Sequence, residues 1–259
     1  MPRISLNDIE MFYDEQNPNE RDDAIVFLHG AGGNHVSWWQ QVPVFREWYR
    51  CISIDQRGFG RSLDPSGAGN ARFVDDLEGL LDALGIERAA LIAQSMGGRS
   101  AIGFAARAPQ RVSALVMADT WGFFDWPELQ AEVQKYRQQQ SDADALLTAR
   151  ALGPTFQAEN PAGTFLYRQI FDLNPPRAQQ PDDPNAPTKE QIERLSVPTL
   201  FLVGSDDGLT PPEIIRRVHE IVPESQYVEV PGCGHSVYFE APETFNEIVG
   251  TFLAEQVKA

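Results

Sequence analysis

The sequence predicts an α/β protein with a largely parallel sheet, and two recurring patterns lead to this prediction. Short continuous apolar runs, rich in β-branched residues, recur along the chain. Runs of this kind suit strands that are covered on both faces. Amphipathic stretches with apolar residues at helical spacing lie between the runs. Strands that alternate with helices in this way are typical of a parallel sheet flanked by helices.

The individual elements follow in chain order. The predicted buried strands are residues 24–28, 51–54, 89–93, 114–117, 199–203 and 227–230. Residues 4–6 and 11–13 could form a hairpin at the edge of the sheet. In residues 73–84 the apolar side chains share one helical face, and Gly85 is expected to end that helix.

The alternation of strands and helices is interrupted once, between residues 121 and 196. This segment is rich in Gln, Ala and charged residues, with helix-like stretches at 128–140 and 143–152 and a Pro-rich stretch at 174–188. We therefore predict a core domain that is formed by residues 1–120 and 197–259, with residues 121–196 as a helical insertion.

Composition argues against several classes of partner. The chain has 259 residues, enough for one large domain, and a formal charge of −16 without a Lys/Arg cluster that could bind nucleic acid. No apolar stretch reaches the roughly 20 residues of a membrane span, and the N-terminus lacks the apolar region of a signal peptide. The two cysteines, Cys51 and Cys233, provide no disulfide framework. We expect a cytoplasmic protein with no nucleic-acid and no membrane partner, of undetermined oligomeric state.

The stretch Ala93-Gln94-Ser95-Met96-Gly97 directly follows a predicted strand. It is close to the G-x-S-x-G turn, in which a serine lies between a strand and a helix with its hydroxyl exposed. Small residues are needed two positions before and after the serine because neighbouring backbone comes close, and alanine stands at the first of these positions. An ordinary helix N-cap is the alternative, since serine is favoured there.

Three further stretches follow other predicted strands. They are the glycine-rich residues 28–33, residues 203–211 with their adjacent aspartates, and residues 231–236, in which a histidine follows Gly234. A glycine loop can aim N–H groups at an oxyanion, and a carboxylate can orient a histidine. A phosphate loop is a poor alternative for residues 28–33, because the Walker spacing is missing. We therefore expect Ser, Asp and His at three successive strand ends, in the chain order of one known serine triad.

At this point the sequence resembles the α/β-hydrolase superfamily over almost its full length. Residues 55–62 are similar to the family's D-x-R-G-x-G-x-S turn, residues 204–211 to its acid loop, and Gly234-His235 with Glu240 to its histidine segment. The resemblance implies an eight-stranded, mostly parallel sheet with a helical cap after the sixth strand. That position matches the insertion at 121–196.

The resemblance also implies roles for single residues. Ser95 is expected to be the nucleophile and His235 the base that takes its proton. Asp207 is expected to orient the imidazole, because the family's carboxylate lies three residues after a glycine, which favours it over Asp206. Asp119, after the sixth strand, is the alternative acid.

The remaining site residues follow from the same resemblance. The backbone N–H groups of Ala31 and Met96 are expected to form an oxyanion hole, with Gly32 as second choice to Ala31. Candidates for the lining of a substrate pocket are Gly32, Trp39, Trp121 and Phe123, although aromatic residues often belong to the core.

Other reactive residues receive structural interpretations. Asp55 and Arg57 are interpreted as a buried or half-buried ion pair that fixes their turn, and Cys233 as a packing residue. No residue spacing indicates a metal site, and no cofactor is expected.

A serine nucleophile favours acyl transfer to water through an acyl-enzyme. We expect a carboxylesterase- or lactonase-like hydrolase that acts on a small to medium apolar ester or lactone under the cap. Three alternatives stay open: a C–C bond hydrolase of ring-cleavage products, cofactor-free peroxide or oxygen chemistry, and a small-ligand receptor that is not an enzyme. Fold alone does not decide among them.

Overall fold

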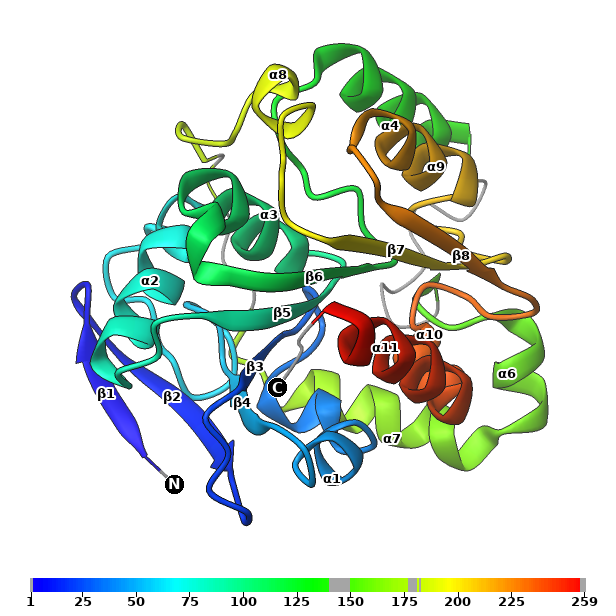
Figure 1. Ribbon diagram of the computed structural model, residues 1–259. Helices are drawn as coiled ribbons and strands as arrows, with labels where there is room; N and C mark the ends of the chain where they lie inside the picture. The colour runs from blue at the N-terminus through cyan, green and yellow to red at the C-terminus, as the bar shows by residue number, and fades with distance from the viewer. Residues whose placement is uncertain (1, 140–149, 177–180, 182, 257–259) are drawn as a thin grey trace.

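The computed structural model describes residues 2–139, 150–176, 181 and 183–256, and its centre is an eight-stranded sheet (Figure 1). The strands are β1 (Arg3–Leu6), β2 (Ile9–Gln16), β3 (Ala24–Leu28), β4 (Arg50–Ile54), β5 (Ala89–Gln94), β6 (Val112–Ala118), β7 (Thr199–Gly204) and β8 (Gln226–Val230). Their spatial order is β1-β2-β4-β3-β5-β6-β7-β8. The predicted runs thus lie on observed strands, and the eight-stranded, mostly parallel sheet is confirmed.

The sheet is antiparallel at one edge and parallel elsewhere. The β1–β2 hairpin pairs antiparallel, and β2 also pairs antiparallel with β4. All other neighbours are parallel, from β4·β3 to β7·β8. Every residue of β3, β5, β6 and β7 is buried. Parallel strands that are covered on both faces show this pattern, and it explains their continuous apolar sequences.

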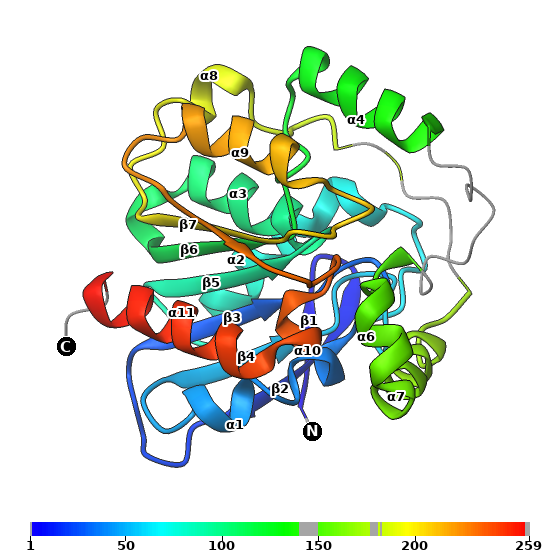
Figure 2. The ribbon, with the colours of Figure 1, turned by 90° about the vertical axis from the view of Figure 1, so that its right-hand side faces the viewer.

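Helices cover both faces of the sheet (Figure 2). One face carries α2 (Phe73–Ala83), α3 (Gly97–Arg107) and α9 (Pro212–Ile221), and the other carries α1 (Val42–Phe45), α10 (Val237–Glu240) and α11 (Pro242–Gln256). Short 3₁₀ helices are η1 (His35–Trp38), η2 (Gly69–Arg72) and η3 (Pro109–Arg111). Helix α2 ends before Gly85, whose φ of +66° is in the left-handed region.

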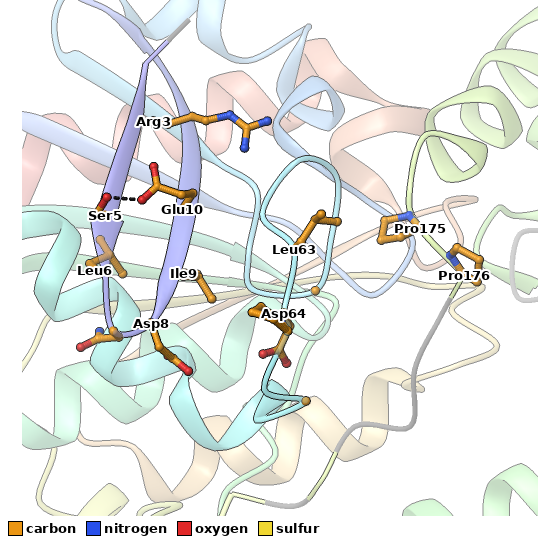
Figure 3. Close-up of a pocket in the computed structure, with 14 residues that line it drawn as sticks. Arg3, Ser5, Leu6, Asp8, Ile9, Glu10, Leu63, Asp64, Pro175 and Pro176 are labelled. Atoms are coloured by element: carbon orange, nitrogen blue, oxygen red, sulfur yellow. Dashed lines mark hydrogen bonds between the residues drawn. The ribbon is translucent and has the colours of Figure 1, made fainter.

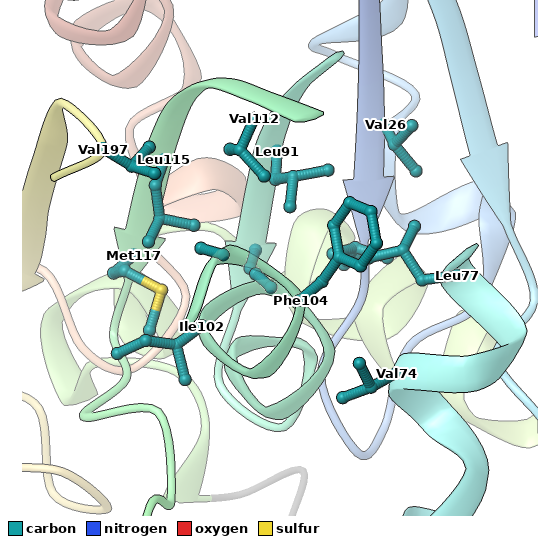
Figure 4. Packing of buried hydrophobic residues seen from close by; sticks show 14 of the residues in the cluster. Val26, Val74, Leu77, Leu91, Ile102, Phe104, Val112, Leu115, Met117 and Val197 are labelled. Carbon is teal, nitrogen blue, oxygen red and sulfur yellow. The ribbon is translucent and has the colours of Figure 1, made fainter. Parts of the chain in front are cut away.

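Each face of the sheet has its own hydrophobic core. On the α3 side, Phe104 lies between the sheet and α2, beside Leu77 (Figure 4). On the opposite side, Trp38 packs on Phe27 and Tyr238, with ring centroids 5.3 and 4.8 Å apart. The central strands are packed on both faces, so the loops at their ends start from fixed positions.

The segment between β6 and β7 contributes four described helices. They are α4 (Pro127–Gln139), α6 (Pro154–Glu159), α7 (Pro161–Asp172) and α8 (Lys189–Ile192). Helix α4 lies beside α9, to which it is tied by an ion pair between Glu132 and Arg217. Helices α6 and α7 lie instead on the other side, where Phe156 and Tyr167 contact Phe239 of α10.

The structure describes only part of the expected helical insertion. Helix α4 matches the predicted helix at 128–140 up to Gln139. Most of the predicted helix at 143–152 and part of the Pro-rich stretch at 174–188 lie outside the described residues. The division into a core domain and a cap remains a prediction. Among the helices of the described ranges, none is long and apolar enough to span a membrane.

Candidate active site

Ser95 lies at the end of β5 in a backbone conformation that L-residues rarely adopt. Its φ is +48°, and its N–H donates a hydrogen bond of 3.0 Å to the carbonyl of Ala118 on β6. A Cβ on Gly97 would overlap the carbonyl oxygen of Leu28, so no larger residue fits there. The tight approach of these backbones forces the turn and raises the serine above the sheet. Strain of this kind is common at functional sites.

The structure brings the predicted Ser95, His235 and Asp207 into one hydrogen-bonded chain. Ser95 Oγ is 2.8 Å from His235 Nε2, and His235 Nδ1 is 2.8 and 2.9 Å from the two carboxylate oxygens of Asp207. The side chains of Asp207 and His235 are almost fully buried. A carboxylate only accepts hydrogen bonds, so Nδ1 is assigned as the donor to Asp207. In the imidazole tautomer that carries its proton there, Nε2 can accept the hydrogen bond of the serine hydroxyl.

Backbone donors hold Asp207 in place. The N–H groups of Leu209 and Thr210 each donate to Asp207 Oδ1 over 2.8 Å. Asp206, its sequence neighbour, is exposed and bonds instead with Ser205. Of the two adjacent aspartates, only Asp207 reaches the imidazole.

The expectation of three successive strand ends is wrong in one respect. Ser95 follows β5, but Asp207 follows β7 and His235 follows β8. In the sheet, β6 lies between β5 and β7. The end of β6 carries Asp119, which therefore lies among the three residues. Chain order alone does not show which strand is inserted between two others.

The glycine loop after β3 presents an oriented peptide group near Ser95. The carbonyl oxygen of Gly30 accepts the N–H of Gly33 at 3.0 Å and lies 2.7 Å from Nδ1 of His29. The carbonyl and the N–H of one trans peptide unit point in opposite directions, so these contacts fix the direction of the Ala31 N–H. Within the described part of the chain, the N–H groups of Ala31 and Met96 have no hydrogen-bond acceptor. Both groups are thus free to meet an oxyanion.

His29 is a neutral imidazole within this loop. Its Nε2 accepts the N–H of Gln56 at 3.0 Å, so the proton lies on Nδ1, which donates to Gly30. Burial lowers the pKa of His29 to about 4. The loop is therefore held by an uncharged donor at neutral pH.

Two more carboxyl groups lie close to the buried Asp207. Burial, and secondly repulsion by Asp207, raises the pKa of Asp119 well above its usual value. Burial likewise raises the pKa of Glu240, although its Oε2 accepts the N–H groups of Gly153 and Gly234, each at 3.0 Å. Glu240 thus joins the β6–β7 segment to the loop of His235.

The predicted ion pair between Asp55 and Arg57 is wrong. Arg57 is fully buried, and its guanidinium binds Asp76 through two hydrogen bonds of 2.7 and 2.9 Å, as well as Asp64 and Asp8. Asp55 binds His35 instead, with 2.7 Å between its Oδ1 and Nδ1 of the ring. Burial acts to raise the pKa of Asp55, but hydrogen bonds from His35 and Arg61 outweigh it, and the pKa is lowered. Each side chain is thus occupied by partners from other segments: Arg57 by α2 and the β1–β2 turn, and Asp55 by His35.

The four candidate pocket residues lie in different local surroundings. Trp121 and Phe123 line a cavity of about 450 Å³, which is also lined by Arg99 and residues of α4. Gly32 faces helix α7, where an added Cβ would lie 2.7 Å from the ring of Phe171. Trp39 is 46% exposed. A role of these four residues in substrate binding remains a prediction.

A second cleft, of about 900 Å³, lies apart from the triad (Figure 3). The β1–β2 hairpin forms one wall, with Leu6 and Ile9, while Leu63 and the Pro175–Pro176 stretch form the other. None of Ser95, Asp207 and His235 lines this cleft.

Three residues of the β6–β7 segment near the site could not be found from the sequence. Tyr167 Oη lies 3.0 Å from Ser236 Oγ, next to His235. Asn174 donates to the carbonyl of Gly32 at 3.1 Å and accepts the N–H of Gly60 at 2.9 Å. Phe171 covers Gly32. Helical spacing shows which face of a helix is buried, but it does not indicate what that face contacts.

The site contains no recognisable metal centre in the described residues, where no group of three His, Cys, Asp or Glu side chains could hold an ion. Its polar groups are a serine hydroxyl, an imidazole, carboxyl groups and unpaired backbone N–H groups. This set of groups can support nucleophilic attack by an oxygen and proton transfer through the imidazole.

Comparison with known proteins adds independent information. A model of the family described as alpha/beta hydrolase fold matches residues 23–242. A Mycobacterium tuberculosis protein with the provisional name non-heme bromoperoxidase BpoC is 30% identical, with 97% of this chain and all of that protein covered. The 2-hydroxy-6-oxo-2,4-heptadienoate hydrolase of Pseudomonas putida is 30% identical over 90% of each chain. The structure of a thermophilic esterase from Thermogutta terrifontis superimposes with a TM-score of 0.79 at 27% identity, over 95% of this chain and 94% of that one.

Proposed function

Because this chain belongs to the α/β-hydrolase family, we propose that it is a serine hydrolase that cleaves a carboxylic ester or lactone through an acyl-enzyme. The observation that carries the proposal is the chain of hydrogen bonds from Ser95 Oγ through His235 to Asp207. An imidazole nitrogen at 2.8 Å from a serine hydroxyl is the geometry of a general base with its nucleophile.

The geometry supports the following sequence of steps. Ser95 Oγ attacks the carbonyl carbon of the substrate while His235 Nε2 takes the hydroxyl proton. Asp207 stabilises the imidazolium that forms and keeps its orientation. The imidazolium then protonates the leaving alkoxide, and the neutral imidazole activates a water that hydrolyses the acyl-enzyme.

The developing oxyanion would be met by the N–H groups of Ala31 and Met96. Donors of this kind act on charge that appears only in the transition state, so they lower the barrier more than they tighten substrate binding. The fixed carbonyl of Gly30 supports the assignment of Ala31, because it fixes the direction of the Ala31 N–H before substrate arrives.

The position of helix α7 is an argument for a small or medium apolar substrate. The Tyr167 hydroxyl of this helix lies 3.0 Å from Ser236 Oγ, next to His235, and its Phe171 ring packs on Gly32 of the glycine loop. A covered site of this kind admits single molecules rather than an oil surface. The likeness to the thermophilic esterase supports an ester as the bond that is cleaved.

The experiment combines a covalent label with a substrate panel. A fluorophosphonate should label Ser95, and Ser95→Ala should lose roughly 10⁴- to 10⁶-fold in turnover, since triad members act as a unit. Ser196→Ala, an exposed serine outside the site, is the matched control and should keep full activity. Normal turnover by Ser95→Ala, or a label on another residue, would refute the serine mechanism.

A second candidate is a C–C bond hydrolase of ring-cleavage products. The likeness to the Pseudomonas putida hydrolase over 90% of both chains favours it. The panel therefore contains p-nitrophenyl esters, lactones and vinylogous diketones. If the protein turned over diketones but neither esters nor lactones, the C–C hydrolase would replace the ester hydrolase as the proposed function. Two other outcomes would also overturn the ester proposal: halogenation or perhydrolysis that depends on peroxide, and ligand-induced thermal stabilisation without any turnover.

A further inference from the structure

Asp119 makes an unusual set of contacts between the loops of the triad. It directly follows β6, its side chain is fully buried, and its φ of +52° is in the left-handed region. Its N–H donates to Leu202 of β7 at 2.8 Å. A non-glycine residue rarely adopts this conformation unless its surroundings hold it there. The position of the Asp119 carboxylate is thus set by the sheet itself.

The two carboxylate oxygens of Asp119 bind two different loops. Oδ1 accepts the N–H of Gly204 at 3.1 Å, and Oδ2 accepts the N–H of Val237 at 3.2 Å. Gly204 ends β7 and begins the turn to Asp207, whose N–H donates back to the Gly204 carbonyl at 3.1 Å. Val237 lies two residues after His235. One carboxylate therefore anchors the backbone of two loops, the one that carries Asp207 and the one that carries His235.

The same two loops are in direct backbone contact. A Cβ on Gly204 would overlap the carbonyl oxygens of Cys233 and Gly234, so the loops touch without intervening side chains. The N–H of Asp206 donates to the Cys233 carbonyl at 2.9 Å. The two loops are therefore close together, and a shift of the backbone at Gly204 or Val237 would move Asp207 relative to the His235 imidazole.

We propose that Asp119 is a positioning residue that sets the distance between Asp207 and His235. The inference rests on the proposed function, because it assigns Asp119 to the same triad. Asp119 is not the acid of that triad, since both carboxylate contacts of the imidazole Nδ1 in the described residues are to Asp207. It acts through the backbone of the two loops and does not touch the reacting atoms.

Asp119→Asn tests this role with almost no change in volume. An amide has one acceptor oxygen, and its NH₂ group would face an N–H donor, so one of the two anchors must break. We expect kcat to fall roughly 10- to 100-fold, the effect of a misplacement of up to about 1 Å, with KM within about twofold. Activity is counted per active site by fluorophosphonate titration, which removes any contribution from unfolded protein.

A spectroscopic readout separates positioning from mere stabilisation. The proton on His235 Nδ1, shared with Asp207, should give a low-field ¹H resonance that Asp207→Asn abolishes. In Asp119→Asn this resonance should move or disappear. The matched control is Asp206→Asn, the same change at an exposed position of the same loop, which should keep both resonance and rate. The titratable groups that interact with Asp119 in the described residues are Asp207, Glu240, Tyr167, Tyr238 and Cys233, so all spectra are compared at one pH.

A double-mutant cycle completes the test. If Asp119 acts through Asp207, then Asp119→Asn should cost little in the Asp207→Asn background. The proposal is overturned if the two losses multiply, if Asp119→Asn lowers only thermal stability, or if its resonance and kcat match the wild type. Should Asp119→Asn fail to fold, Asp119→Ser keeps one acceptor and gives the same readouts. The ¹H spectrum needs no substrate, so it tests Asp119 even if Ser95→Ala shows that the proposed chemistry is wrong.

Discussion

At the scale of single residues, His29 shows how burial links the site to pH. Its folded pKa is about 4, whereas its ordinary value is 6.5, because burial disfavours the charged ring. Between these two values the unfolded chain binds more protons than the folded protein. The stabilising contribution of the neutral ring is therefore complete above pH 6.5 and is lost as the pH falls toward 4.

The prediction concerns the free energy of unfolding of the wild type against His29→Gln. The wild type should lose about 2 to 3 kcal/mol between pH 7.5 and 4.5 that the variant does not lose, since one pKa unit corresponds to about 1.4 kcal/mol. Urea unfolding at several pH values measures the free energy of unfolding of both proteins. The wild type and the variant contain the same carboxyl groups, so the effect of these groups cancels in the difference between the two curves. Parallel curves would mean that His29 is not held neutral.

Residues with a chemical signature could be predicted at this scale, and residues that act through the backbone could not. Ser95, Asp207 and His235 stand in recognisable turns, and the structure places them within hydrogen-bond distance. The sequence indicates Asp119 only as an alternative acid. Its partners are the N–H groups of Gly204 and Val237, which belong to other strands, and no local pattern indicates such partners.

At the scale of elements, the C-terminal end of α7 is docked on the glycine loop by three contacts. Asn34 donates to the Ile170 carbonyl at 2.8 Å, Phe171 covers Gly32, and Asn174 bridges Gly32 and Gly60. The sequence predicts a helical insertion with helices at 128–140 and 143–152, but it indicates neither α6 nor α7 as a separate helix. Amphipathic spacing defines a buried face, whereas the choice of the surface that receives it depends on the finished sheet.

Asn174→Ala should weaken this docking. It removes the hydrogen bonds to Gly32 and Gly60, each worth about 1 kcal/mol, as well as a bond to the Phe171 carbonyl within the end of α7. The value of kcat/KM for a short ester should therefore fall roughly 5- to 30-fold. Gly32→Ala, whose methyl group would press on Phe171, should act in the same direction. Gln169→Ala, at an exposed position of α7, is the control and should change little. Unchanged kcat/KM in Asn174→Ala would show that α7 does not shape the site.

At the scale of the whole molecule, Arg57 joins parts that are distant in sequence. Its guanidinium binds Asp76 of α2, Asp64 of the loop after β4, and Asp8 with the Asn7 carbonyl in the β1–β2 turn. Burial raises the pKa of Asp76, although Arg57 opposes the shift. The edge hairpin is thus fastened to the sheet and to α2 by one buried cation.

Arg57→Leu should lower the free energy of unfolding by about 3 to 5 kcal/mol, because it leaves buried carboxyl groups unpaired. Arg107→Leu is the matched comparison, since Arg107 binds Asp75 and Glu78 at a partly exposed site. Arg107→Leu should lower the free energy of unfolding by less than about 1 kcal/mol. Equal losses in the two variants, measured by urea unfolding, would contradict the role of burial.

The order of the strands has a consequence for how the protein could be divided. Ser95 precedes the β6–β7 segment, whereas Asp207 and His235 follow it. A break between α4 and α6 would give one fragment with six strands and the hydroxyl, and a second with two strands and the acid–base pair. Neither fragment alone would carry out the proposed chemistry. Fused to two interacting proteins, the fragments could serve as a split reporter whose signal depends on reassembly of the β6·β7 contact.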